Sequence, residues 1–182
     1  MTKRPFLAEL DELQQRLLSM GGLVEFAIHR SVRALIDRDC ALSHQVWENE
    51  RRINEMEMEI DEQSTRILAL HQPVARDLRF ITAAIKINSD LERMGDLAVN
   101  IVQRAVSLAR QPQVKPLIDV PHMSRLVESM VHRSLDAFVK RDPEMAQAVL
   151  AADDEVAGGR RPAHGCAGRG SSWWRSRCRR RG

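Results

Sequence analysis

Two rows of oxygen-bearing side chains have the residue types and the spacing to do chemistry. In the first row, within the sequence DLERMGDLAVN, the carboxylates Glu92 and Asp96 lie four residues apart. That spacing puts both on one face of a helix, where like charges destabilise the helix by about 0.2 to 0.5 kcal/mol. A helix that carries them inward needs a compensating cation or a raised carboxyl pKa. The pair therefore indicates a carboxylate metal site, with a solvated acidic face as the alternative.

The second row lies in the preceding helical segment. It comprises Glu50, Asn54, Glu57 and Asp61, and the first row extends through Asn88, Glu92, Asp96 and Asn100. At a rise of about 1.5 Å per residue, the two rows are level in an antiparallel hairpin that turns at Gln72-Pro73. In that register Glu57 lies opposite Asn88, and Asp61 lies one turn nearer the hairpin turn. The predicted metal ligands are Glu50, Glu57, Asp61, Glu92 and Asp96.

An oxygen-rich cluster suits hard or borderline cations, so the expected cofactor is a divalent or trivalent metal ion: iron, Mn or Mg. The rival design, the di-iron oxidase bundle, needs Glu-x-x-His pairs, and the sequence contains none. His29 and His132 are interpreted as ordinary interfacial histidines, and Arg76, Arg79 and Lys86 either face solvent or meet an anionic partner. The sequence has no phosphate-cradling glycine loop and no nucleophile–base pair. No catalytic residue is therefore predicted.

Apolar residues recur every three or four positions through three long segments, which is typical of amphipathic helices. The segments run over residues 6–37, 39–70 and 73–110. Gly21-Gly22 is expected to loosen the first helix, Asp39 to cap the second, and Pro73 to occupy the first turn of the third. Three such helices joined by short turns bury their apolar faces by packing as an antiparallel bundle. The predicted fold class is all-α.

The chain repeats itself after a shift of 103 residues. The shift pairs Glu25 with Glu128, His29-Arg30-Ser31 with His132-Arg133-Ser134, and Arg38-Asp39 with Arg141-Asp142. This duplication indicates tandem three-helix bundles, of which the second is begun but incomplete. The predicted domains are 1–112 as the first bundle, 113–121 as a proline-containing linker, 122–157 as the partial second bundle, and 158–182 as a disordered tail.

The tail differs in composition from everything before it. Residues 159–182 hold eight arginines and no acidic residue, whereas the rest of the chain has 20 basic and 25 acidic residues. The formal net charge of +3 therefore comes from the tail, and the body is acidic. Such a composition predicts disorder. Out-of-frame translation of GC-rich DNA is the preferred explanation because the change falls in mid-repeat, so no direct nucleic-acid partner is expected; a basic arm that binds nucleic acid is the alternative.

The compartment is predicted from what the sequence lacks. It shows no signal peptide and no apolar run long enough to span a membrane. Cys40 is the one cysteine in the body, which supports neither a disulfide framework nor a thiolate metal site. These features predict a cytoplasmic protein.

Four stretches resemble the PhoU family of phosphate-transport regulators. They are MGGLVE at 20–25, EMEIDE at 57–62, QPVARDLR at 72–79 and DLERMGD at 90–96. The resemblance covers about residues 6–156 and implies tandem three-helix bundles. It also implies that acidic motifs bind multinuclear metal clusters on the bundle surface, through Glu57 with Asp61 and through Glu92 with Asp96. The register argument adds Glu50, whose repeat partner is Asp153.

By resemblance, the protein is a cytoplasmic regulator that reaches a membrane only through its partners, and it is not an enzyme. Such proteins act with the ATPase of the phosphate ABC transporter and with its sensor histidine kinase to repress the phosphate-starvation (Pho) response and limit uptake when phosphate is plentiful. They are commonly homodimers. A carboxylate-bridged metal-dependent enzyme and a nonfunctional truncated homologue are the alternative interpretations.

The sequence departs from the family pattern at its C-terminal end. Ala157 stands where the family usually has the second carboxylate of its motif, and the repeat counterparts of Glu92 and Asp96 would lie beyond residue 182. A second metal site is therefore not expected. An incomplete bundle exposes apolar stripes, so the chain is expected to be unstable or to associate through residues 119–156.

Overall fold

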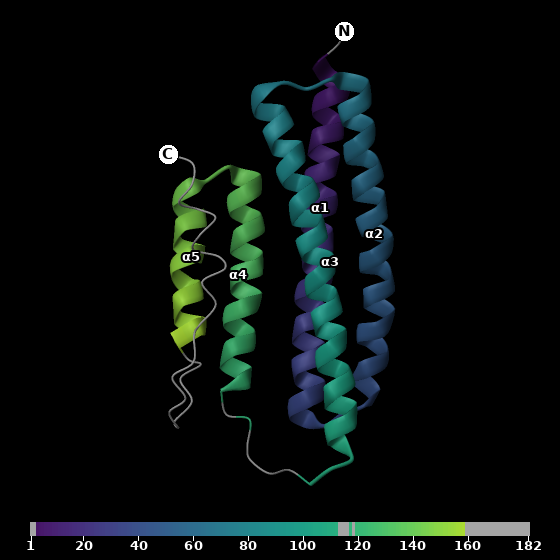
Figure 1. Ribbon diagram of the computed structural model, residues 1–182, viewed down its shortest axis with the longest axis vertical. Coiled ribbons are helices and arrows are strands. Elements are labelled where there is room, and N and C mark those ends of the chain that lie inside the picture. Colours follow the sequence, from purple (N-terminus) through teal and green to yellow (C-terminus); the bar gives the residue numbers. More distant parts are fainter. Residues whose placement is uncertain (1–2, 113–116, 118, 159–182) are drawn as a thin grey trace, which may run out of the picture.

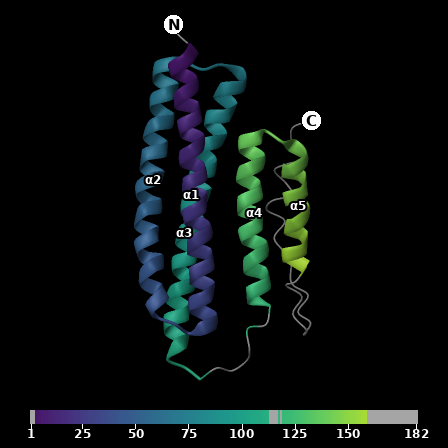
Figure 2. The same cartoon turned by 180° about the vertical axis from the view of Figure 1, so that it is seen from behind.

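The structure is a computed structural model that describes residues 3–112, 117 and 119–158. Five α-helices follow one another in that part of the chain: α1 Lys3–Asp37, α2 Ala41–His71, α3 Ala75–Ala109, α4 Val120–Lys140 and α5 Pro143–Gly158. Helices α1, α2 and α3 run up and down as a three-helix bundle, and α4 and α5 form a hairpin beside it (Figure 1, Figure 2). The predicted all-α class, with a complete first bundle and an incomplete second, is confirmed. The predicted tail lies outside the described residues, except for Gly158, which ends α5.

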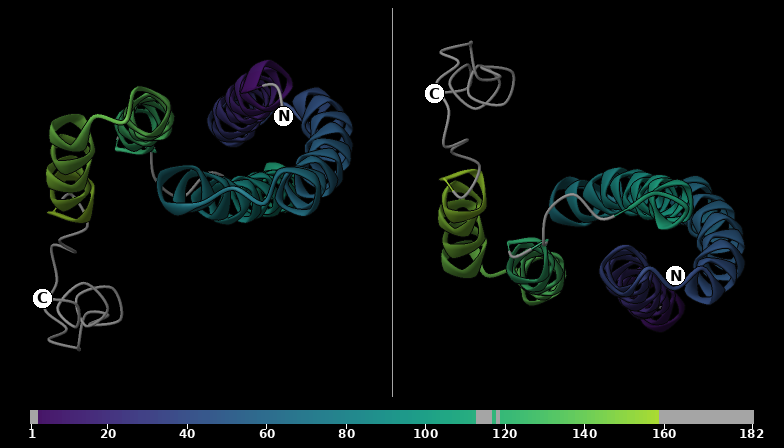
Figure 3. Two further views of the ribbon diagram at one scale, coloured as in Figure 1. Left: turned by 90° about the horizontal axis from the view of Figure 1, so that it is seen from above. Right: turned by 90° about the horizontal axis from the view of Figure 1, so that it is seen from below.

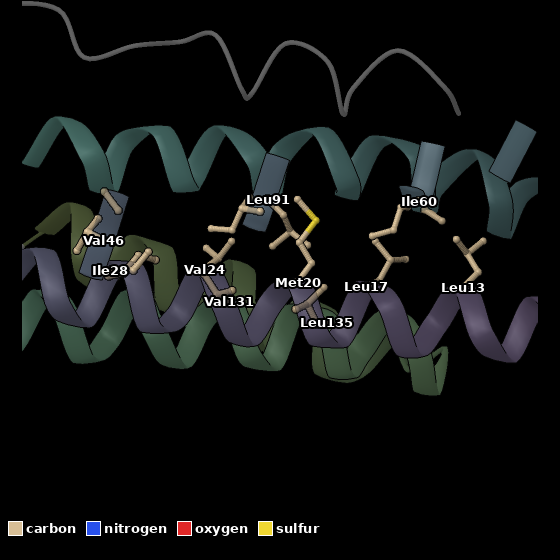
Figure 4. Close-up of a cluster of buried hydrophobic side chains, with 14 of the residues drawn as sticks. Leu13, Leu17, Met20, Val24, Ile28, Val46, Ile60, Leu91, Val131 and Leu135 are labelled. Atoms are coloured by element: carbon tan, nitrogen blue, oxygen red, sulfur yellow. The ribbon is translucent and has the colours of Figure 1, made fainter. Parts of the chain in front are cut away.

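Helix α1 lies at the centre of the packing. It contacts α2, α3 and α4, whereas α5 contacts only α4 among the described helices (Figure 3). The apolar stripe of α1 is fully buried at Leu13, Leu17, Met20 and Val24 (Figure 4). Burial of one such side chain stabilises a fold by about 1.5 to 3 kcal/mol, so this stripe anchors the bundle. No helix within the described ranges has the length and apolarity to span a bilayer.

The two glycines of α1 do not loosen it, so that expectation is wrong. The helix is continuous from Lys3 to Asp37. A Cβ atom added at Gly21 would stand 2.1 Å from Leu135 Cδ1 of α4, whereas one added at Gly22 would meet nothing within 4 Å. Gly21 therefore lets α4 approach α1 closely, and this packing overrides the weak helix propensity of glycine.

The turn between α2 and α3 also differs from the expectation. Pro73 precedes α3 instead of occupying its first turn. The reason is that α2 ends with Gln72 in the left-handed region, at φ 46°, and α3 starts only at Ala75. Three residues, 72–74, therefore make the reversal.

Two further predicted boundaries shift. The N-cap position of α2 is Cys40 and not Asp39, although Asp39 Oδ1 accepts a hydrogen bond from the Ala41 backbone N–H at 2.8 Å. Helix α4 begins at Val120, so the predicted linker extends two residues too far. Pro121 belongs to the first turn of α4, where its missing N–H has no helical partner to lose.

Arg38 ties the turn between α1 and α2 to the end of α3. Its Nη2 donates hydrogen bonds to the carbonyls of Leu108 at 2.6 Å and Ala109 at 2.9 Å, and also to the carbonyl of Gln111. The last carbonyls of a helix have no partner within the helix. The guanidinium satisfies them, and its charge complements the negative end of the helix dipole.

Helix α4 docks on α1 through reciprocal histidine–glutamate contacts. His132 Nδ1 lies 3.2 Å from Glu25 Oε1, and His29 Nδ1 lies 3.6 Å from Glu128 Oε2. Because the internal repeat pairs the two histidines and the two glutamates, each histidine meets the glutamate of the other repeat. The interfacial position predicted for His29 and His132 is confirmed.

Candidate metal centre

The predicted register of the two polar rows is confirmed by contacts between α2 and α3. Asn88 Nδ2 donates a hydrogen bond to the backbone carbonyl of Glu57 at 2.9 Å. Gly95, between Glu92 and Asp96, faces Ile53: an added Cβ would stand 3.1 Å from Ile53 Cδ1. Because glycine permits this close approach, the carboxylates beside it are brought level with those of α2.

Four carboxylates share one electrostatic environment. Partial burial raises the pKa of Glu92. Three neighbouring negative charges raise the pKa further, in the order Asp96, Glu57 and Glu50. Asp61, which is exposed, is not among the charges that act on Glu92. In the part of the chain that the structure describes, none of the five predicted ligands forms a salt bridge.

Two buried amide oxygens in these rows lack a hydrogen-bond donor. Asn54 Nδ2 donates to Glu50 Oε1 at 2.6 Å, and Asn54 Oδ1 is buried without a partner. Asn88 has the same pattern: its Nδ2 donates to the Glu57 backbone carbonyl, and its Oδ1 is buried without a partner. An unsatisfied buried acceptor costs about 1 to 3 kcal/mol. Amide oxygens are of the ligand type that Mg²⁺ and Mn²⁺ prefer.

The side chains do not form a closed coordination shell. Among the described residues, no three His, Cys, Asp or Glu side chains are grouped so that they could hold a metal ion as they stand. The acidic side chains lie on an open helical face, half-buried at Glu50, Glu57 and Glu92 and exposed at Asp61 and Asp96. Residue types and register thus fit a cation, and binding requires the carboxylates to rotate toward one another on their fixed helices.

The structure adds residues that the sequence pattern does not assign. Asn54 and Asn88 are predicted as members of the rows but not as ligands; the signal for them is their spacing from the carboxylates. Arg141, the residue that follows α4, lines one hollow together with Arg76 and Arg79 of α3, and Lys86 does not. The only sequence signal for Arg141 is its place as the repeat counterpart of Arg38.

The fold and the site together define a helical-bundle protein with a carboxylate-lined face. A family model described as the PhoU domain matches residues 17–105 and 120–158, and the chain belongs to this family. The resemblance predicted from the four sequence stretches is confirmed.

Known relatives agree in sequence and in fold. The chain is 43% identical over 152 residues to the phosphate-specific transport system accessory protein PhoU homolog of Pseudomonas aeruginosa, covering 83% of this chain and 63% of that protein. It is similar to the crystal structure of PhoU from Pseudomonas aeruginosa, with a TM-score of 0.79 at 42% identity, over 84% of this chain and 73% of that one. The phosphate transport system regulatory protein PhoU from Streptococcus pneumoniae gives a TM-score of 0.77 at 29% identity, over 84% and 72%. The chain therefore spans less than two thirds of the length of the Pseudomonas relative.

Proposed function

We propose that this chain is an accessory regulator of phosphate transport. Its relatives are named accessory or regulatory proteins of a phosphate transport system. The observation that carries the proposal is the family match over residues 17–105, which contain both polar rows. The face proposed to bind metal is thus within the region shared with those relatives.

The regulation is negative in this proposal. The chain acts in the cytoplasm, as a homodimer, with the ATPase of the phosphate ABC transporter and with its sensor histidine kinase, and represses the phosphate-starvation response when phosphate is plentiful. The support for these partners is the resemblance of the sequence motifs to the family. No catalytic role is assigned to any residue.

The proposed cofactor is a divalent or trivalent ion of iron, Mn or Mg. Glu50, Glu57, Glu92 and Asp96 would hold it, with Asp61 extending the motif that begins at Glu57, and the ion supplies positive charge to an acidic face. The contribution of the chain is to fix the spacing of α2 and α3. The Asn88 hydrogen bond to Glu57 and the close contact of Gly95 with Ile53 keep the two rows level.

A complementation experiment tests the role. In a bacterium whose own PhoU-family gene is deleted, the chain is expected to restore repression of a phosphate-starvation reporter and to lower uptake of radiolabelled phosphate. Glu92→Gln with Asp96→Asn should abolish both effects at equal protein level. If the parent chain and the double variant repress the reporter equally, the metal site is contradicted but the regulatory role is not. If the parent chain does not repress the reporter, the regulatory role is contradicted.

A further inference from the structure

A hollow of about 550 Å³ lies where the start of α3 faces the end of α4 and the start of α5. Its rim carries Arg76, Arg79 and Arg141, and its lining is largely apolar, with Phe80 and Phe138 at the centre. We call this surface the arginine hollow. It shares no residue with the carboxylate rows, so a ligand bound there can be tested separately from the proposed metal site.

The rim of the arginine hollow is positively charged. Among the described residues, none of its three arginines forms a salt bridge. The one acid in the lining is Asp142, whose Oδ1 accepts hydrogen bonds from the backbone N–H groups of Glu144 at 2.9 Å and Met145 at 3.0 Å. That carboxylate is engaged at the N-terminus of α5, which leaves the guanidinium groups available to an anion.

The apolar floor favours an aliphatic or similarly compact side chain over a flat ring. Phe80 and Phe138 stack on each other with ring centroids 4.6 Å apart and an interplanar angle of 12°. The Arg141 guanidinium carbon lies over the Phe80 ring, 5.3 Å from its centroid. Both interactions already use the ring face of Phe80, so it offers little stacking surface to a nucleobase.

The backbone beside the hollow is strained. Ala75, immediately before Arg76, has φ 48°. The left-handed conformation costs about 1 to 2 kcal/mol for a residue with a Cβ atom. Such strain is typical of ligand-binding segments, where the surrounding structure holds it in place.

We propose that the arginine hollow binds a segment of a partner protein in which an apolar side chain is flanked by carboxylates. The apolar side chain would enter between Phe80, Phe138 and the alanines of the floor. The arginine rim would pair with the carboxylates, because guanidinium groups match carboxylates in a two-bond geometry. Arginine and aromatic residues are also the residue types that contribute most to binding at protein interfaces.

The test selects random dodecapeptides displayed on phage against the immobilised full chain. Sequences that combine Asp or Glu with Leu, Ile or Met should be enriched. A fluorescein-labelled peptide from the selection, measured by anisotropy, should bind at least tenfold more weakly to Arg76→Glu/Arg79→Glu. Ala146→Glu, which puts a carboxylate at an exposed position of the floor, should have the same effect.

The matched control is Arg66→Glu/Arg125→Glu, which makes the same change in net charge at exposed positions outside the hollow. It should leave the peptide affinity unchanged within a factor of two, and thermal melts should show that all variants fold. The proposal is overturned if the selection enriches no acidic sequences, or if the control variant loses as much affinity as Arg76→Glu/Arg79→Glu. It is also overturned if the peptide is displaced completely by polyglutamate or by 10 mM inorganic phosphate, a concentration that fills a weak anion site with a Kd of about 1 mM.

Discussion

Replacing Glu92 by glutamine should have opposite effects on the metal-free and the metal-loaded protein. Glu92 is half-buried and feels the negative charges of Asp96, Glu57 and Glu50. A like-charge neighbour at helical spacing, as Asp96 is, costs about 0.2 to 0.5 kcal/mol. Glu57 and Glu50 lie across the hairpin on α2 and act less strongly than Asp96, and solvent screening keeps the sum of the three for a half-buried group at about 0.5 to 1 kcal/mol. The metal-free variant should therefore be more stable by this amount, which corresponds to a rise in Tm of about 1 to 4 °C.

The same repulsion gives the pH dependence a definite sign. Burial and the neighbouring charges raise the pKa of Glu92 in the folded state. Below the pKa of the unfolded chain, about 4.3, the carboxyl is protonated in both states and costs nothing. As the pH rises above that value, the folded protein gives up this proton less readily than the unfolded chain, so stability falls until the folded-state pKa is passed. Glu92→Gln removes this part of the decline.

Metal reverses the order of stability. A ligand that binds only the folded state stabilises it by about 2.7 kcal/mol when its free concentration is 100 times Kd. The parent protein should gain this stabilisation from Mn²⁺ or Fe²⁺, whereas Glu92→Gln, having lost a charged ligand, should gain much less. The parent should then melt above the variant, although it melts below it in EDTA.

Calorimetric melts of both proteins, in EDTA and with graded Mn²⁺ or Fe²⁺ under anaerobic conditions, distinguish these outcomes. Glu48→Gln is the matched control, because Glu48 is an exposed glutamate of α2 outside the polar rows. It should respond to metal as the parent does. Equal metal stabilisation of the parent and Glu92→Gln would refute the site, and a less stable Glu92→Gln in EDTA would refute the account of the repulsion.

Three further predictions concern the frame around the site. Gly95→Leu should separate α2 from α3 and lower the free energy of unfolding, measured in urea, by about 1 to 3 kcal/mol. Gly22→Leu is the control, because an added Cβ there meets nothing within 4 Å, and it should not lower the free energy of unfolding. Equal losses in the two variants would contradict the close approach of α2 and α3. Arg38→Ala should cost about 1 to 2 kcal/mol through its lost hydrogen bonds, and Arg38→Gly less, because φ is 56° there; a larger loss for glycine would contradict this. Leu150 is 71% exposed, and Leu150→Glu should reduce self-association in sedimentation velocity; a parent chain that sediments as a monodisperse monomer and melts cooperatively would contradict association through residues 119–156.

Much of the first bundle and the register of its polar rows can be predicted from the sequence for a simple reason. A helix has a fixed rise per residue, and the turn between α2 and α3 is short, so counting residues from that turn places Glu57 opposite Asn88. The hydrogen bond between them confirms the count. The orientation of the carboxylate side chains cannot be predicted in this way, because rotamers depend on neighbours that the pattern does not specify.

The wrong prediction for Gly21 arises from a contact between residues that are distant in sequence. The local pattern predicts that Gly21 weakens α1, but Leu135 of α4 occupies the space that a side chain would need. The arginine hollow likewise joins Arg76 and Phe80 to Phe138 and Arg141. Nothing in the local pattern of either segment reveals this neighbour, since it depends on where α4 docks.

The internal repeat explains how α4 docks. Two helices with related sequences that pack antiparallel are related by a pseudo-twofold axis. If a residue of one helix contacts a residue of the other, the repeat counterparts of these two residues also contact each other. Glu25 with His132 and His29 with Glu128 are such a reciprocal pair of contacts. The contact of Gly21 with Leu135 lies one turn from Glu25 on α1. The repeat counterpart of Gly21 in α4 is Ser124, so α4 has no reciprocal glycine at that position. The symmetry of the docking is therefore approximate, because glycine on α1 makes room for Leu135 and serine stands at the counterpart position on α4.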